Sequence, residues 1–280
     1  MSARRFIQVD VFESGPLSGN PLAVVLDGDG LSTEQMQQLT DWTNLSEATF
    51  LLPPTDPSAD YRVRIFCPGR ELPFAGHPTL GSCHAWLSAG GRPHTTDRVI
   101  QECGAGLVEV RRDGERLSFA APPMTRFGPV DDELLAQRLE HLSIDPSAVV
   151  DVSWIDNGPG WMGVRLASAA EVLAVPLPAA SLPGFDVGLV GAHPPGSECA
   201  IEVRALFADA RGSVREDPVT GSLNASVAQW LLTTGELTAP YVAAQGQVIG
   251  RAGRVFVDTD GDTVWVGGRS TTVIDGSIDV

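Results

Sequence analysis

The clearest alternation of apolar and polar residues lies at residues 61–67, where Tyr61, Val63, Ile65 and Cys67 alternate with arginine at two of the positions between them. This period of two predicts a half-buried β-strand. Other short apolar runs predict strands at 6–12, 21–27, 47–52, 149–155, 161–167 and 200–207. Residues 105–120 and 247–274 are expected to form strand hairpins around Asp-Gly turns.

Helical spacing appears in four other segments. Residues 33–43 carry apolar side chains three apart and follow Ser32, which can cap a helix. Residues 132–141 predict a second helix. Two more helices are expected to begin at Pro78 and Pro218, because proline is favoured in the first helical turn.

The chain also repeats itself at an offset of 140, half of its 280 residues. The repeated positions pair Val24, Leu26, Val63, Arg64, Pro78, Gly81, Ser82, Ala85, Gly106, Val108 and Arg111 with identical residues 140 positions later. Each half would then hold mostly strands and one central helix. We therefore expect an α+β protein with two similar lobes and a cleft between them.

The net charge of the chain excludes some classes of binding partner. The 19 Lys and Arg against 35 Asp and Glu give a net charge of −16. Such a chain repels phosphate backbones and anionic membranes, so we expect no nucleic-acid and no membrane partner. A small anionic substrate is not excluded, because the electrostatic potential at a binding site can be positive although the net charge of the protein is negative.

Cysteines and histidines bear on compartment and cofactors. No Cys-x-x-Cys occurs among the four cysteines, and no apolar signal segment precedes Asp10, so free thiols in the cytoplasm are expected. No histidine or carboxylate cluster has metal-ligand spacing, so no metal site is predicted.

The two proline-led helices offer candidate chemistry at their starts. His77 precedes Pro78 and Asp217 precedes Pro218, so each would be an N-cap. Two helix N-termini facing a cleft could hold a carboxylate without any Lys or Arg, and Gly76 and Gly221 would allow close backbone approach. Alternatively, Asp217 only caps its helix and His77 is a plain turn residue.

Glu47 is a third candidate, in the segment Asn44-Leu45-Ser46-Glu47. It lies where a predicted helix gives way to an apolar strand. Partial burial there would raise the pKa of its carboxyl toward a value useful for proton transfer. A surface position at the start of the strand is the alternative.

Four stretches carry a family resemblance. They are Glu-Leu-Pro-Phe-Ala-Gly-His-Pro-Thr-Leu-Gly at 71–81 and Glu-Asp-Pro-Val-Thr-Gly-Ser at 216–222, together with Asp-Val-Phe at 10–12 and Gly-Asn-Pro-Leu-Ala-Val-Val at 19–25. With these, the chain resembles the phenazine-biosynthesis isomerase family, often called PhzF-like, within the diaminopimelate-epimerase-like fold.

The resemblance implies two pseudo-symmetric lobes, each a curved, mostly antiparallel sheet wrapped round a central helix. The N-terminal lobe would be residues 1–118 with a returning C-terminal strand at 268–280, and the C-terminal lobe residues 119–267. The active site would lie in the cleft between the lobes. A homodimer is expected, as is common in the family.

The resemblance also assigns roles to residues. Glu47 matches the catalytic general acid/base, and His77 and Asp217 match residues that hold polar groups of the substrate and assist proton movement. The positions that line the substrate carboxylate match Ser46, Gly76, Gly221 and Ser222. The family's namesake reaction moves a proton between ring carbons of trans-2,3-dihydro-3-hydroxyanthranilate without metal or organic cofactor.

We therefore expect a cofactor-independent isomerase acting on a small unsaturated, cyclic carboxylic acid. The alternatives are a specialised-metabolite isomerase, a C–C-cleaving or hydrolytic relative with another substrate, and a ligand-binding relative without turnover. Two residues depart from the family pattern: Cys67, where Thr is more usual, and Leu223, where a small residue is common.

Overall fold

The computed structural model describes residues 2–209 and 212–280. The chain divides into two compact units. Unit 1 is Met1–Ala120 with Gly267–Val280, and unit 2 is Ala121–Val266. The lobe boundaries expected from the sequence were 118/119 and 267/268. None of the helices within the described residues has the length and apolar character that a membrane span requires.

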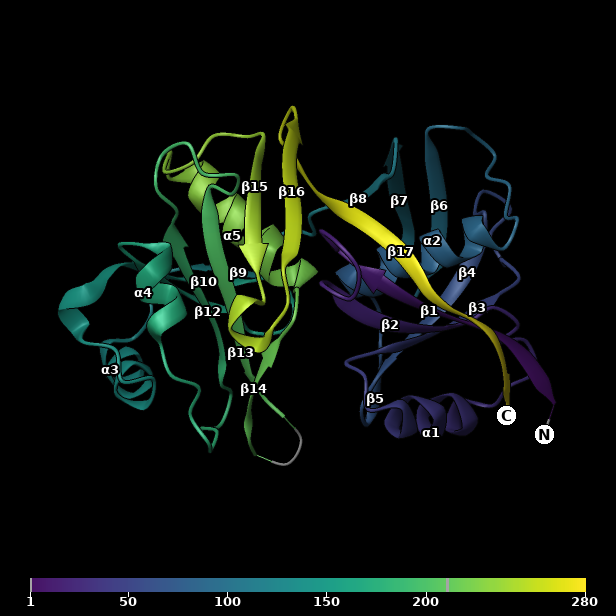
Figure 1. Ribbon diagram of the computed structural model, residues 1–280, viewed down its shortest axis with the longest axis horizontal. Coiled ribbons are helices and arrows are strands. Elements are labelled where there is room, and N and C mark those ends of the chain that lie inside the picture. Colours follow the sequence, from purple (N-terminus) through teal and green to yellow (C-terminus); the bar gives the residue numbers. More distant parts are fainter. Residues whose placement is uncertain (1, 210–211) are drawn as a thin grey trace. The chain divides into compact units, whose positions relative to one another are not determined.

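Unit 1 contains most of the predicted elements of the first half (Figure 1). They are β1 (Ala3–Val11), β2 (Asn20–Val25), α1 (Thr33–Thr43), β3 (Ala48–Leu52), β4 (Tyr61–Cys67), β5 (Arg70–Leu72), α2 (Gly76–Ser88), β6 (Arg98–Cys103), β7 (Gly106–Asp113) and β8 (Arg116–Ala120). Helix α1 has the predicted bounds and the predicted cap. Ser32 and Gln35 form a reciprocal capping box, which satisfies backbone N–H groups at its start.

Unit 2 contains the remaining elements, and the final strand runs from it into unit 1. They are β9 (Arg126–Gly128), α3 (Asp132–His141), η1 (Pro146–Ala148), β10 (Val149–Asp156), β11 (Met162–Leu166), α4 (Ala169–Ala174), β12 (Asp186–Ala192), β13 (Ile201–Ala208), β14 (Val214–Asp217), α5 (Gly221–Thr233), β15 (Tyr241–Gln245), η2 (Gln247–Ile249), β16 (Gly253–Asp260) and β17 (Thr263–Asp279).

Strand pairing is the same in both units. In unit 1, β1 pairs antiparallel with β2, β2 parallel with β3, β3 antiparallel with β4, and β4 both antiparallel with β5 and parallel with β6. Strands β10 to β15 repeat this order of partners and directions. The fold is therefore α+β, built from two topologically equivalent halves.

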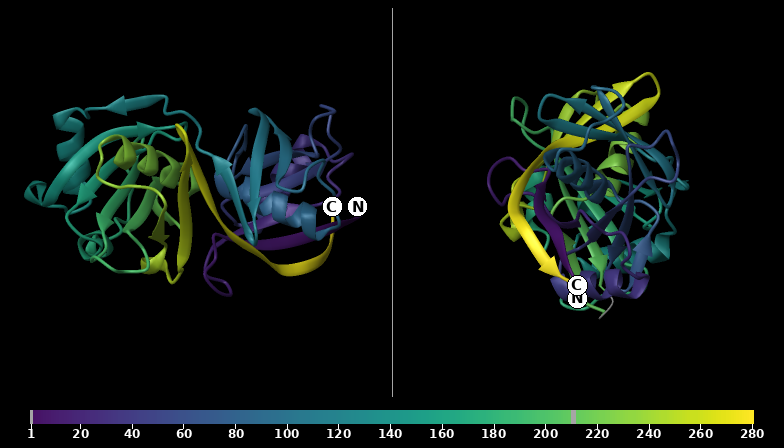
Figure 2. Two further views of the ribbon diagram at one scale, coloured as in Figure 1. Left: turned by 90° about the horizontal axis from the view of Figure 1, so that it is seen from above. Right: turned by 90° about the vertical axis from the view of Figure 1, so that its right-hand side faces the viewer.

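The C-terminal part of β17 completes the sheet of unit 1. It pairs antiparallel with β1, from Val11 opposite Ser270 to Ala3 opposite Asp279. The N–H of Ser2 donates to the carbonyl of Val280, so both ends of the chain lie side by side in unit 1 (Figure 2).

The single offset of 140 residues was wrong over part of the repeat. It holds for β4 and β13, which begin at Tyr61 and Ile201, but the central helices begin at Gly76 and Gly221, an offset of 145. Strand β13, its connection to β14, and β14 itself are together five residues longer than their counterparts in unit 1. The match of Pro78 with Pro218 is therefore not structural.

This shift also changes which residues of the two units correspond to each other. His77 is the second residue of α2, and the corresponding position of α5 is Ser222. Asp217 is instead the last residue of β14, which corresponds to Leu72 at the end of β5. His77 and Asp217 do not occupy equivalent helix starts.

Most residues of the two central helices are buried, and the exposed ones lie at their C-terminal ends. Helix α2 lies against β1, β2, β3, β6, β7 and β8. A Cβ on Gly81 of α2 would lie 2.5 Å from a methyl of Leu22, so only glycine permits this approach of helix and sheet. In unit 2 the glycine is on the strand: Gly188 of β12 faces Leu223 of α5.

Candidate functional site

Glu47 lies between a helix end and a strand start in unit 1. Asn44 adopts the left-handed conformation that ends α1, with φ 59°, and the chain then passes through the half-buried Ser46 to Glu47, directly before β3. The side chain of Glu47 is 17% exposed. It is therefore partly buried, as predicted, and a raised pKa for its carboxyl stays a prediction.

His77 faces Glu47 from the first turn of α2. Its Nε2 lies 3.5 Å from Oε2 of Glu47, and both atoms are buried. The structure thus brings together two of the three residues expected to be catalytic.

The protonation of His77 follows from its surroundings. Burial lowers the pKa of His77 to about 3, because the imidazolium would lose its hydration. Its Nδ1 lies 3.4 Å from the side-chain nitrogen of Asn20, which can only donate, so Nδ1 accepts. With this orientation of the Asn20 amide, the proton of the neutral ring is assigned to Nε2, the atom that faces Glu47.

Asn20 was not singled out by the sequence analysis. It is fully buried at the start of β2, after a loop that Asp10 anchors by accepting the N–H groups of Ser18 and Gly19. A Cβ on Gly19 would lie 2.1 Å from the carbonyl oxygen of Val11, so glycine is required there. A buried polar residue in the Gly-Asn-Pro segment was the signal that could have found it.

The start of α2 differs from the prediction. The N-cap is Ala75, which makes no side-chain cap, and the first helical hydrogen bond runs from Thr79 to Ala75. The interpretation of His77 as N-cap was wrong. The buried Gly76 and His77 are the first two residues of the helix, so their N–H groups precede its hydrogen-bond ladder.

Asp217 also does not cap a helix. It ends β14, three residues before Thr220, which is the N-cap of α5. The Thr220 hydroxyl does not bond to the helix backbone but donates to Oδ2 of Asp217 at 2.5 Å. The carboxylate of Asp217 is thus hydrogen-bonded to the N-cap residue of α5.

Gly221 and Ser222 are the first two residues of α5. The Ser222 hydroxyl accepts a hydrogen bond of 3.1 Å from the indole N–H of Trp161, and its carbonyl accepts one of 2.9 Å from the side chain of Asn157. Asn157 and Trp161 flank the Gly-Pro-Gly sequence at 158–160. Their role in holding the α5 start was missed.

The predicted site residues thus form two groups. Ser46, Glu47, Gly76 and His77 lie in unit 1, and Asp217, Gly221 and Ser222 lie in unit 2. Cys67 and Leu223, which the resemblance singled out as unusual, make none of the hydrogen bonds described above for the site residues. Cys67 ends β4 and its carbonyl accepts a hydrogen bond from Gln37, and Leu223 is buried in the core beside Gly188.

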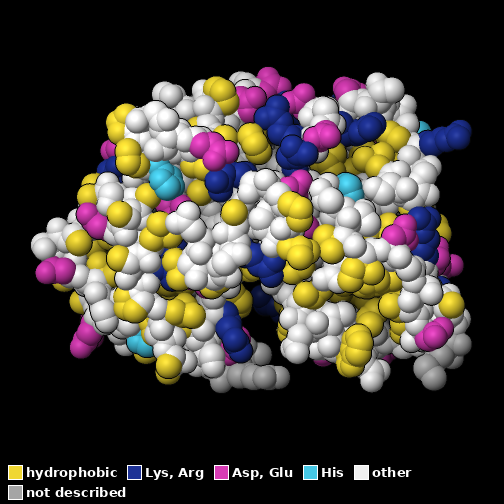
Figure 3. Space-filling view, in the orientation of Figure 1, with side chains coloured by type: hydrophobic (Ala, Val, Ile, Leu, Met, Phe, Trp, Pro, Cys, Tyr) yellow, Lys and Arg dark blue, Asp and Glu magenta, His cyan; other side chains and the backbone are white. Residues whose placement is uncertain are grey.

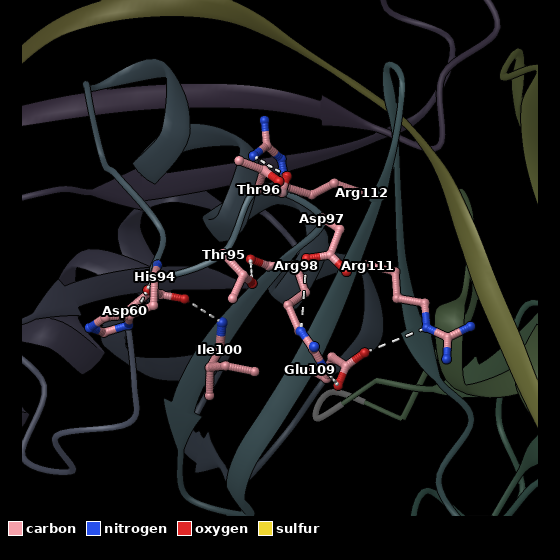
Figure 4. A network of polar contacts seen from close by, with 10 residues as sticks. All are labelled: Asp60, His94, Thr95, Thr96, Asp97, Arg98, Ile100, Glu109, Arg111 and Arg112. Atoms are coloured by element: carbon pink, nitrogen blue, oxygen red, sulfur yellow. Dashed lines mark hydrogen bonds and ion pairs between the residues drawn. The ribbon is translucent and has the colours of Figure 1, made fainter.

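A cavity of about 480 Å³ in unit 1 involves none of these residues. Asp60 and His94 are among the residues that line it. The buried carboxylate of Asp60 accepts from the backbone N–H groups of His94 and Ile100, each at 2.7 Å, and its Oδ1 lies 2.7 Å from Nδ1 of His94 (Figure 4). These bonds fix the loop before β6, which is a structural role.

No group of three or more His, Cys, Asp or Glu suited to hold a metal ion occurs in residues 2–209 and 212–280. His193 pairs with the buried Glu202 at 3.1 Å, and burial raises the pKa of that Glu202 carboxyl. All four cysteines are free thiols.

Comparison with known proteins places the fold and these segments in one family. The family model described as phenazine biosynthesis-like protein matches residues 9–276. Antisense-enhancing sequence 1 of Schizosaccharomyces pombe is 35% identical and the match covers 99% of both chains.

Two further similarities bear on activity. The trans-2,3-dihydro-3-hydroxyanthranilate isomerase of Pseudomonas aeruginosa is 34% identical over 92% of this chain and 91% of its own. The crystal structure of a predicted epimerase from the same species superposes with a TM-score of 0.80 at 28% identity, covering 98% of this chain and 99% of the other.

Proposed function

The chain belongs to the phenazine biosynthesis-like protein family and is an isomerase, and from this premise we propose that it moves a proton on a small unsaturated, cyclic carboxylic acid. The reaction would be similar to that named for the relative from Pseudomonas aeruginosa. Glu47 would serve as general acid and base, and no metal or organic cofactor would take part.

The observation that carries this proposal is the contact of Glu47 with a neutral imidazole. As a carboxylate, Glu47 accepts a proton from a substrate carbon and, as the resulting acid, returns a proton to another carbon of the same molecule. Glu47 ends in its starting form and the mass of the substrate is unchanged. His77 donates a hydrogen bond from Nε2 to the substrate oxygen or carboxylate on which negative charge develops during the proton transfer.

The helix starts supply the proposed contacts to the substrate carboxylate. The N–H groups at Gly76 and Gly221 and the hydroxyls of Ser46 and Ser222 are the proposed donors. Neither α2 nor α5 has a side-chain cap that would occupy its N-terminal N–H groups. A helix N-terminus favours an anion, so the net charge of −16 does not oppose this role.

Asp217 is proposed to act on the same substrate molecule as Glu47 and His77. It would accept a hydrogen bond from a polar group of the substrate and assist proton movement. Its hydrogen bond from Thr220 supports this role, because an oriented acceptor loses little freedom when the substrate binds.

The proposal is tested by incubation with trans-2,3-dihydro-3-hydroxyanthranilate, and then with other unsaturated cyclic acids, in deuterated water. We expect deuterium at carbon by NMR and a product isomeric with the substrate. Glu47→Gln should lower turnover by about 10²–10⁴-fold, the usual contribution of general acid–base catalysis. Glu34→Gln, at an exposed glutamate of α1, is the matched control.

Other outcomes would point elsewhere. Near-wild-type turnover in Glu47→Gln would remove Glu47 from the mechanism. A product of changed mass would identify a hydrolytic or C–C-cleaving relative. Tight binding of an acid without deuterium uptake would identify a ligand-binding relative.

We also propose a homodimer in the cytoplasm. Trp42 of α1 and Val273 and Ile274 of β17 are exposed apolar side chains, and hydrophobic atoms gather over these elements in Figure 3. Exposed apolar surface of this kind marks interaction sites. The four free thiols fit a reducing compartment. Light scattering coupled to size-exclusion chromatography tests the dimer, and a monomer at micromolar concentration would contradict it.

A further inference from the structure

Gln245 forms the centre of a buried hydrogen-bond network around the start of α5. It is the last residue of β15 and is 1% exposed. Its Oε1 accepts from the N–H of Thr220 at 3.0 Å and from the side-chain amide of Asn224 at 2.7 Å. Its Nε2 donates to the carbonyl of Asp217 at 3.1 Å and to the hydroxyl of Thr220 at 2.9 Å.

These contacts leave one consistent arrangement of protons. The backbone N–H of Thr220 can only donate, so the atom of Gln245 that faces it is the oxygen. The Gln245 nitrogen must then donate to the Thr220 oxygen. Because this oxygen already accepts, the single hydroxyl proton of Thr220 is directed to Oδ2 of Asp217.

We propose that Gln245 is a positioning residue that acts through Thr220 to hold the Asp217 carboxylate in one orientation, as a hydrogen-bond acceptor. The inference rests on the proposed role of Asp217 in the reaction. Gln245 itself is buried behind Thr220 and is not a catalytic residue. It controls both the backbone of Asp217, through the carbonyl contact, and its side chain, through the hydroxyl.

Unit 1 contains a similar arrangement without an acid. Gln101 of β6 is fully buried, donates to the hydroxyl of Thr79 in the first turn of α2 at 3.0 Å, and accepts from the hydroxyl of Tyr61 at 2.8 Å. A glutamine tied to a helix-start threonine can therefore be purely structural. Gln101→Leu consequently provides a control for loss of a buried glutamine.

The kinetic test compares five variants in the deuterium-uptake assay with trans-2,3-dihydro-3-hydroxyanthranilate. Gln245→Leu and Thr220→Val should each lower kcat by up to about a hundredfold, because misplacement by about 1 Å can cost that much. Their effects should not add in the double variant, since both act through one hydroxyl. Thr220→Ser, which keeps the hydroxyl, should restore most of kcat, and Gln101→Leu should leave kcat near wild type.

Failures of the inference and of the proposed function are distinguishable. Asp217→Asn with full turnover would remove Asp217 from the reaction. A defective Asp217→Asn together with near-wild-type kcat in Gln245→Leu would overturn the inference alone. Additive losses in the double variant would also overturn it.

A crystal structure of Gln245→Leu tests the same point without any substrate. We expect the Thr220 hydroxyl to turn away and the Asp217 side chain to leave its rotamer. An unchanged contact between Thr220 and Asp217, with the Oδ2 distance still near 2.5 Å, would overturn the inference.

Discussion

Nε2 of His77 lies 3.5 Å from Oε2 of Glu47, and the proton on that imidazole belongs to Nε2 because Asn20 donates to the other ring nitrogen. The pair is therefore a carboxylate facing a neutral donor, not an ion pair. A charged imidazolium would hold the carboxylate in its ionised form. A neutral imidazole leaves Glu47 able to take up a proton and give it back.

This arrangement predicts opposite tautomers for two histidines of unit 1. At pH 8 the two-bond 1H–15N spectrum should show His77 protonated on Nε2. Nδ1 of His94 lies 2.7 Å from the Asp60 carboxylate, which can only accept, so His94 should show the Nδ1–H form. Asn20→Asp should reverse the tautomer of His77, because the new carboxylate would accept from Nδ1. A wild-type His77 protonated on Nδ1, or on both nitrogens, would contradict the assignment.

Stability should depend on pH through His77. In the unfolded chain its pKa is about 6.5, whereas burial lowers the folded-state pKa to about 3. Between these values the unfolded state binds a proton that the folded state does not, so stability is retained above pH 6.5 and lost as pH falls toward 3. Urea unfolding from pH 7 to pH 4 should therefore show a larger loss for wild type than for His77→Asn.

His84 provides the internal check on this comparison. Burial also lowers its pKa, and it is present in both proteins, so its contribution cancels in the difference. Equal slopes of unfolding free energy against pH in the two proteins would show that His77 is not a buried neutral group.

Elements with strong local signals were predictable from the sequence. The alternation at 61–67, the capped helix at 33–43 and the helix at 132–141 have the predicted bounds. Each is specified by local periodicity and capping. Short strands such as β5 and β14 carry no such signal and were not predicted.

The site was predictable in its residue types but not in its connections. The contact of Glu47 with His77 joins α1's end to α2's start, which no local pattern reports. Neither proline marks the helix start that it predicted, because Pro78 is the third residue of α2 and Pro218 precedes α5 by three positions. Asn20 and Gln245 act through buried tertiary hydrogen bonds, which sequence spacing does not show.

Glu216, next to Asp217, should be important for stability. It forms a buried ion pair with Arg204 at 2.8 Å, with side chains 1% and 0% exposed, and Arg204 also donates to the carbonyls of Val172 and Val175 near the end of α4. Glu216→Gln should lower the free energy of unfolding by about 3–5 kcal/mol, because Arg204 would remain buried without its counter-ion.

The control for this effect is an exposed pair in the same unit. Arg165 and Glu236 lie 2.6 Å apart with side chains 21% and 44% exposed. Glu236→Gln should cost less than about 1 kcal/mol, as solvent screens the pair. Urea denaturation of both variants measures the difference, and similar costs at the two positions would contradict the prediction.

Leu223, the residue after Ser222, should be coupled to Gly188. A Cβ at Gly188 would lie 2.4 Å from Cδ1 of Leu223, and the Leu223 side chain is fully buried. Gly188→Ala should therefore destabilise the protein by about 1–3 kcal/mol through overpacking. Leu223→Ala should cost about 2–5 kcal/mol through the cavity that it leaves.

In the Leu223→Ala background the methyl added by Gly188→Ala enters that cavity. The loss of stability in the double variant should therefore be smaller than the sum of the two single losses. Urea denaturation of the four proteins measures this coupling, and strict additivity would show that the two side chains do not compete for the same space.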